Sequence, residues 1–196
     1  MLALIFLVTT VMAIYIKVLL LRIWMQWARC DFYNPFSQFV VKITQPVVKP
    51  LRRIIPSIGP LDSASLLIAY IVSVLLGPVL LRLFVPDPIF LYLGLVILVK
   101  AAGVLVFWVI IVRSLMSWIS QGRNPVDYVL IQLTEPLMAP VRRIIPAMGG
   151  IDFSAMAVIL ILYMLNFLGL EYIPGAGPSS NLTVAFYPTG ALVAFL

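Results

Sequence analysis

The chain has 196 residues, of which 63% are hydrophobic and only 10% are charged. A soluble domain carries about 25% charged residues and cannot hide so large an excess of apolar side chains in its core, so the composition excludes an ordinary soluble globular protein. The net charge is +6, and with one cysteine and no histidine the chain cannot form an internal disulfide and lacks the commonest metal ligand and proton shuttle.

The apolar residues fall into four segments that are long enough to span a membrane as helices. They are residues 1–21, 63–81, 89–112 and 153–170, and their only charged side chains are Lys17 and Lys100. About 20 helical residues cross a hydrocarbon core, and in lipid a helix satisfies its own backbone hydrogen bonds. The sequence therefore predicts an all-α membrane protein with about four transmembrane helices.

The first segment stands where a signal peptide would stand. It has no basic residue before its apolar run and no A-x-A cleavage motif after it, and it continues into Lys17 and Arg22. We therefore expect a helix that is retained in the mature protein.

The connection between the first two segments is basic and divided by prolines. Asn34 is expected to cap a helix that begins at Pro35, where a missing N–H costs nothing, and Pro46 is expected to break that helix. Pro56 ends the following stretch, and Asp62 is expected to cap the next transmembrane helix. Apolar residues at helical spacing predict a short amphipathic helix that lies at the membrane interface or against the bundle. They are Phe36, Phe39, Val40, Ile43 and Val47.

The same pattern returns 90 residues later, which indicates two tandem repeats. The run Arg-Arg-Ile-Ile-Pro at 52–56 recurs at 142–146. Each repeat is helix, basic loop with an amphipathic helix, helix, and both repeats cross the membrane in the same direction. Residues 1–88 form repeat 1, residues 89–170 form repeat 2, and residues 171–196 form a tail. The second copies of the structural residues are Asn124, Pro125, Pro136, Pro146 and Asp152.

Basic residues decide the orientation. Residues 22–62 carry six and residues 113–152 carry four, whereas the tail from residue 171 carries none. Cytoplasmic loops hold the excess of Lys and Arg, so both basic loops are expected in the cytoplasm and both termini outside. The anionic inner leaflet then accounts for the positive charge, and no nucleic-acid partner is expected.

The paired arginines of the two loops are the first candidates for function. They can form one cationic patch that binds lipid phosphates or an acidic partner. The simpler interpretation is topological: each repeat needs a positive anchor, and Asp62 or Asp152 pairs with it locally. The paired arginines are Arg52, Arg53, Arg142 and Arg143.

Lys100 is the second candidate, because it lies near the middle of the third apolar segment. An ammonium at that depth costs about 2.5–3.5 kcal/mol on insertion scales, and no acid lies inside the other segments. It marks an ion pathway, a subunit contact or a structural site within the membrane. Without histidine or a glycine-rich phosphate loop, we expect no catalytic residues, no cofactor and no metal.

At these motifs the sequence resembles the YggT/YlmG family of bacterial membrane proteins. The resemblance rests on the repeated Asn-Pro, Thr-x-Pro and Arg-Arg-Ile-Ile-Pro motifs and on the run from Arg22 to Val41, and it extends to about residue 170. It implies a multi-pass protein of the inner membrane with periplasmic termini. It also implies roles in osmotic or extracytoplasmic stress, and in cyanobacterial and plastid relatives in division, nucleoid distribution or cytochrome assembly. It brings no agreed biochemical activity.

Two functions stay open from the sequence. One is a non-enzymatic interaction or assembly factor in the stress response, with membrane-protein partners or self-association. The other is a small oligomeric channel or transporter that acts in osmotic stress.

Overall fold

The computed structural model describes residues 2–53, 55, 61–81, 88–119, 124–144 and 154–172, and the elements in these residues are helices. The expected all-α class is therefore confirmed for the described part of the chain. Pro56, Pro146, Asp152 and residues 173–196 of the predicted tail lie outside it. The helices are α1 (Leu2–Trp27), α2 (Pro35–Arg52), α3 (Ser63–Leu81), α4 (Ile89–Ile119), α5 (Pro125–Ile144) and α6 (Ser154–Tyr172).

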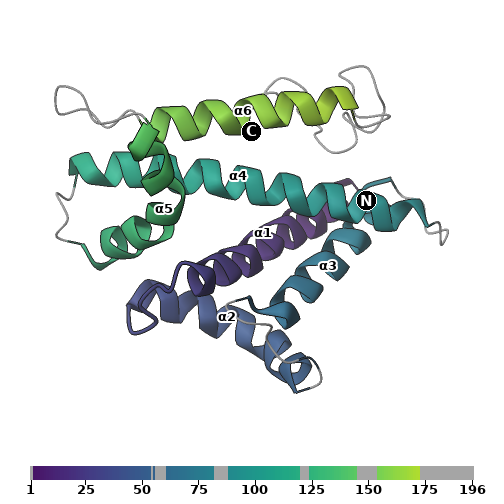
Figure 1. The fold of residues 1–196 in the computed structure, drawn as a ribbon. Coiled ribbons are helices and arrows are strands. Elements are labelled where there is room, and N and C mark those ends of the chain that lie inside the picture. Colours follow the sequence, from purple (N-terminus) through teal and green to yellow (C-terminus); the bar gives the residue numbers. More distant parts are fainter. Residues whose placement is uncertain are drawn as a thin grey trace.

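The six helices form a bundle in which α4 crosses the middle (Figure 1). Helix α6 runs beside α4, and α3 packs against both α1 and α4 on the other side. The short helices α2 and α5 lie at the end of the bundle where α1 and α4 finish, whereas the N-terminus lies at the opposite end (Figure 1). The two segments that the sequence assigns to basic loops therefore gather at one end of the molecule.

Helices α1 and α4 run past the predicted ends of their apolar segments. They have 26 and 31 residues, so Arg22 and Arg113 lie within helices and not in the loops where the sequence placed them. A helix continues through an arginine when its charge finds polar partners, and both arginines have such partners in α2 or α5. Two stretches, Ala3–Trp27 and Ile89–Met116, are long and apolar enough to cross a membrane.

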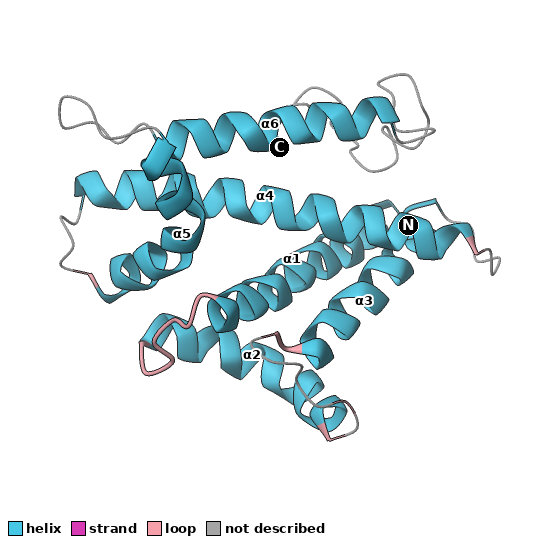
Figure 2. Cartoon of the chain, in the orientation of Figure 1, coloured by secondary structure: helices cyan, strands magenta, loops and turns pink. Residues whose placement is uncertain are grey.

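Helix α1 ends in a left-handed turn at Arg29, whose φ is 53°. Cys30 N donates to Met25 O at 2.9 Å and Arg29 N donates to Gln26 O at 3.2 Å, which are the two bonds of a Schellman motif. Met25 and Cys30 are buried in one apolar cluster, and this contact fixes the turn that leads into α2 (Figure 2). Burial also raises the pKa of the Cys30 thiol to about 11.

Helices α2 and α5 begin as the sequence predicts. The Asn34 side-chain oxygen accepts from Phe36 N at 3.0 Å, and the Asn124 side-chain oxygen accepts from Val126 N at 3.1 Å. Each asparagine is followed by a proline at the first helical position, where no N–H is needed. The capping prediction is therefore confirmed in both copies.

The prediction that Pro46 and Pro136 break these helices is wrong. Both lie inside continuous helices, which run on to Arg52 and Ile144. A proline removes one backbone bond and bends a helix, but packing on both sides of it can hold the two halves in one element. In α2 the residues before and after Pro46 supply that packing, since Thr44 and Val48 are fully buried.

The apolar stripe predicted for α2 divides between two surroundings. Val40 is buried against the bundle, whereas Phe39, Ile43 and Val47 are exposed. The corresponding stripe of α5 is more deeply packed, because its central residues join the second apolar cluster. These buried residues are Val129, Leu130 and Leu133.

Helices α3 and α4 approach each other closely at Gly94. A Cβ on Gly94 would lie 2.9 Å from the Val74 Cα atom, which is closer than side-chain carbons come. Small residues allow such backbone approach between membrane helices. Gly103, further along α4, has open space at the same position.

Candidate functional site

Buried charged side chains meet where α1, α2 and α3 come together. Asp62 precedes α3 and its side chain is 0% exposed, and the Arg22 side chain of α1 is 7% exposed. Arg22 Nε lies 3.3 Å from Asp62 Oδ2, and Arg22 Nη1 donates to Thr44 Oγ1 of α2 at 2.6 Å. One arginine thus joins three helices.

Arg52, near the C-terminal end of α2, approaches the same carboxylate from the other side. Its Nη2 lies 2.5 Å from Asp62 Oδ2 and its Nε lies 3.2 Å from Asp62 Oδ1, which is bidentate pairing. Ser65 Oγ donates to Asp62 Oδ2 at 2.6 Å, and Gln26 Oε1 accepts from Arg52 at 3.3 Å. This is the local pairing that the topological interpretation of the arginines includes. We call Arg22, Thr44, Arg52, Asp62 and Ser65 the arginine clamp.

The clamp keeps Asp62 ionised. Burial raises the pKa of its carboxyl, but the hydrogen bonds from Arg52 and Ser65 and the charge of Arg52 outweigh burial and hold the pKa below its ordinary value. Both carboxylate oxygens of Asp62 accept hydrogen bonds from other members of the clamp. This arrangement fixes α2 on α1 and α3.

The second repeat makes the matching contact between its first two helices. Arg113 of α4 donates to Thr134 Oγ1 of α5, and also to Met138 Sδ at 2.7 Å. Thr134 in turn donates to the Leu130 carbonyl at 2.7 Å, as Thr44 does to its own helix. An arginine in the long helix and a threonine in the short helix therefore recur as a pair.

The two short helices also contact each other. Asn34 Nδ2 donates to Pro125 O at 2.6 Å, so the residue that caps α2 also binds the start of α5. Asp31 N donates to Gln132 Oε1 at 3.0 Å. These bonds connect the end of the bundle across the two halves of the chain.

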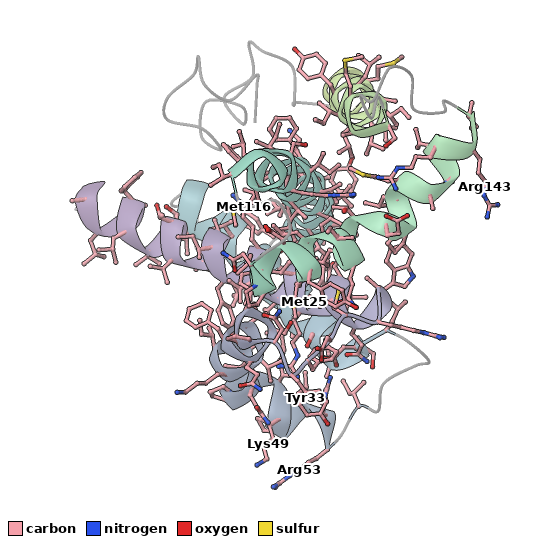
Figure 3. All side chains as sticks on the ribbon, turned by 90° about the vertical axis from the view of Figure 1, so that its left-hand side faces the viewer. Met25, Tyr33, Lys49, Arg53, Met116 and Arg143 are labelled. Carbon is pink, nitrogen blue, oxygen red and sulfur yellow. The ribbon has the colours of Figure 1, made fainter. Side chains whose placement is uncertain are left out.

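The four paired arginines divide by their surroundings. Arg52 belongs to the clamp, and Arg142 Nη1 lies 3.3 Å from Glu135 Oε1. Arg53 and Arg143 are exposed and lie far apart (Figure 3). The described residues therefore place two arginines in ion pairs and two on separate surfaces.

Lys100 lies in α4 and is partly buried. It has no hydrogen-bond or ion-pair partner among the residues that the structure describes. It therefore differs from Arg22, which is more deeply buried and is compensated by Asp62.

Sequence reasoning missed the partners of Arg22. The available signal was the repetition of an arginine in each long helix and of a threonine in each proline-divided segment, which pairs Arg22 with Thr44 and Arg113 with Thr134. Across the described ranges, no three acidic or cysteine side chains gather as a metal site would require.

Comparison with known proteins matches the chain to one family model and to several bacterial relatives. The family model described as CCB3/YggT matches residues 1–84 and 92–173. The uncharacterized protein YggT of Escherichia coli K12 is 58% identical over 172 residues, which cover 88% of this chain and 92% of the relative. A Vibrio alginolyticus protein is 55% identical over 170 residues, covering 83% and 91% of the two chains. An uncharacterized Pseudomonas aeruginosa protein is 35% identical over 180 residues, covering 85% and 87%. No solved structure matches the chain.

Proposed function

The chain belongs to the CCB3/YggT family, and from this premise we propose that it is a non-enzymatic interaction or assembly factor of the bacterial inner membrane. Its proposed role is in the response to osmotic or extracytoplasmic stress, which rests on the family resemblance. The observation that carries the proposal is the arginine clamp. Its buried charges pair with one another, and these contacts hold the short helix α2 in place.

Four membrane spans are part of this proposal. Only 11% and 17% of the two long apolar windows are buried inside the protein, whereas the core helix of a soluble protein would be mostly buried. Helices α3 and α6 have 19 residues each, roughly 28 Å of helix at 1.5 Å per residue, which is close to the hydrocarbon thickness. Both lengths and exposures support spans on α1, α3, α4 and α6.

Two parallel repeats, with cytoplasmic basic loops and periplasmic termini, complete the proposed topology. The recurring asparagine caps and arginine–threonine pairs support the duplication, as do the two separate stretches matched by the family model. The gathering of α2 and α5 at one end of the bundle supports a common side for both loops (Figure 1). Their excess of basic residues favours the cytoplasm.

A protein partner is expected on the exposed face of α5. Tyr128 and Ile131 lie three residues apart on this helix, and their side chains are 58% and 42% exposed. Residues at this spacing share one helix face, and an exposed apolar pair on a packed helix is a typical anchor for a partner.

Photocrosslinking in native membranes tests the interaction factor. A crosslinking amino acid at Tyr128 or Ile131 should capture a defined protein in stoichiometric amounts, and osmotic upshift should change the yield. The buried positions Val129 and Leu133 serve as controls within the same helix. If the exposed and buried positions capture the same background, the interaction function is refuted.

The alternative function is a small oligomeric channel, and Lys100 is the observation that favours it. A partly buried ammonium without a described partner fits a wet path or a subunit contact. Ion flux through proteoliposomes that Lys100→Leu abolishes would support the channel. Stress survival and complex formation that are both unchanged in Lys100→Leu would remove any functional role for this lysine.

A further inference from the structure

An open groove of about 870 Å³ runs along the outer side of α2, and basic residues line it. Lys42, Lys49 and Arg53 are exposed there, and their spacing of seven and four residues places them on one helix face. Lys49 and Arg53 extend in the same direction, away from the bundle (Figure 3). The lining contains no acidic residue, and the three cations have no partner among the described residues.

Two of the three cations of the groove occur in the first repeat alone, because Arg53 recurs as Arg143. At the matching positions of α5, Gln132 replaces Lys42 and Ala139 replaces Lys49. Gln132 is already engaged, since its side-chain oxygen accepts from the Asp31 backbone N–H. A topological anchor needed by each repeat would occur in both copies, so the two lysines of α2 require another explanation.

Two prolines add hydrogen-bond acceptors to the same groove. Pro46 and Pro50 line it, and neither has an N–H to donate to the carbonyl four residues before it. The carbonyls of Lys42 and Pro46 therefore lack their ordinary helical donor. Lys42 and Pro46 both line the groove, so the groove combines cationic residues with residues whose carbonyls are free to accept, which suits a phosphate headgroup that carries hydroxyl donors.

An exposed apolar stripe lies beside the cations. The Phe39, Ile43 and Val47 side chains are 62%, 40% and 46% exposed, and Val40 and Val48 on the opposite side are buried against the bundle. One side of α2 thus packs on protein, one is apolar and open, and one is cationic. A helix at a membrane surface combines apolar insertion with attraction to anionic lipid in this way.

We propose that the groove on α2 binds the headgroup of an anionic phospholipid. Lys42, Lys49 and Arg53 contact the phosphate, the freed carbonyls accept from the headgroup hydroxyls, and the apolar stripe lies among the acyl chains. The inference rests on the membrane placement in the proposed function. The proposal assigns lipid recognition to three residues of repeat 1. The sequence alone predicted lipid binding by the paired arginines of both repeats.

Lipid retention by the full-length protein tests the proposal. The protein is exchanged into nanodiscs that contain phosphatidylglycerol and phosphatidylcholine in equal amounts, and retained lipids are counted by native mass spectrometry. The test variants Lys42→Gln and Lys49→Ala install the residues of the second repeat. Arg143→Gln is the matched control, because it removes one exposed charge outside the groove.

The wild type should retain phosphatidylglycerol in preference to phosphatidylcholine. Each groove substitution should lower this preference about fivefold, because it removes one of the three cations that contact the bound headgroup. Arg143→Gln should leave the preference near the wild-type value, because Arg143 does not line the groove that retains the lipid. The double variant Lys42→Arg with Lys49→Arg keeps the charge and should keep the preference for phosphatidylglycerol. Equal melting temperatures show that the variants are folded.

Three results would overturn the proposal. They are no lipid preference in the wild type, an equal loss in Arg143→Gln, and an acidic protein that crosslinks at Lys42 or Lys49 and is not displaced by phosphatidylglycerol. Failure of the partner capture at Tyr128 refutes the interaction function and leaves the lipid result standing. The two proposals therefore fail separately.

Discussion

Replacing Asp62 with asparagine keeps the size of the side chain and removes the carboxylate that compensates Arg22 among the residues that the structure describes. The Arg22 side chain is 7% exposed, so its charge stays buried after the change. Breaking a buried ion pair on one side costs about 3–5 kcal/mol of unfolding free energy. The Arg52 side chain is 41% exposed, and water screens its pair, so Arg52→Gln should cost about 1 kcal/mol or less. The expected difference in unfolding free energy between the two variants follows from the different exposure of Arg22 and Arg52.

Reversible unfolding of the protein in micelles, followed by tryptophan fluorescence, measures these costs. Asp31→Asn is the matched control, because Asp31 is exposed and, within the described part of the chain, its side chain accepts from the nearby Tyr33 N–H alone. Removing both charges, in Arg22→Gln with Asp62→Asn, should cost less than the sum of the two single changes, because no buried charge is left alone. If Asp62→Asn costs no more than Arg52→Gln or Asp31→Asn, the clamp is not what holds α2 to the bundle.

The same variant has a defined pH dependence. The pKa of Asp62 is lower in the folded protein than its ordinary value of 3.8. Its contribution to stability is therefore fully present above about pH 4 and is lost as pH falls through the folded pKa. Asp62→Asn should remove this part of the acid limb and lower stability by a constant amount at neutral pH.

Three further predictions follow from single positions. Gly94→Ala should lower the melting temperature because its Cβ meets the backbone of Val74, whereas Gly103→Ala should be neutral or stabilise by about 0.5–1 kcal/mol, and parallel thermal melts compare them. Arg29→Gly should stabilise the protein by about 1 kcal/mol in the same melts, because glycine adopts the left-handed turn without the strain of a side chain, and an unchanged or lower stability would contradict this. Cys30 should react with maleimide about 100-fold more slowly in the folded protein at pH 8 than after unfolding in detergent, because its pKa of about 11 leaves little thiolate; equal rates would show that the thiol is accessible.

The features predictable from the sequence are those that depend on local chemistry. The asparagine caps at Asn34 and Asn124 and the helices that follow them need only the residues on either side. The apolar segments likewise reveal α1, α3, α4 and α6 because length and composition suffice. The family resemblance is confirmed by the family model, and it adds no chemistry.

The features that were missed depend on contacts across the fold. Pro46 reads locally as a helix breaker, and only the burial of Thr44 and Val48 against the bundle keeps α2 continuous. The local sequence indicates that a membrane segment ends at Arg22. The partner that compensates its charge, Asp62, is brought to it only where three helices meet. The left-handed turn at Arg29 could not be predicted, because the position carries no glycine.

The motifs that recur between the two halves of the chain account for the scaffold and not for the differences between the halves. Both repeats keep the asparagine cap and the arginine–threonine pair, which hold a short helix against a long one. The surfaces of these helices have diverged: α2 carries the lysines of the groove, and α5 carries Tyr128 and Ile131 with Glu135 beside them. Conserved internal contacts with divergent faces are expected when two copies of one scaffold bind different things. The proposed division is therefore lipid at α2 and protein at α5, and exchanging the lysines of α2 for the glutamine and alanine of α5 should impair the first function alone.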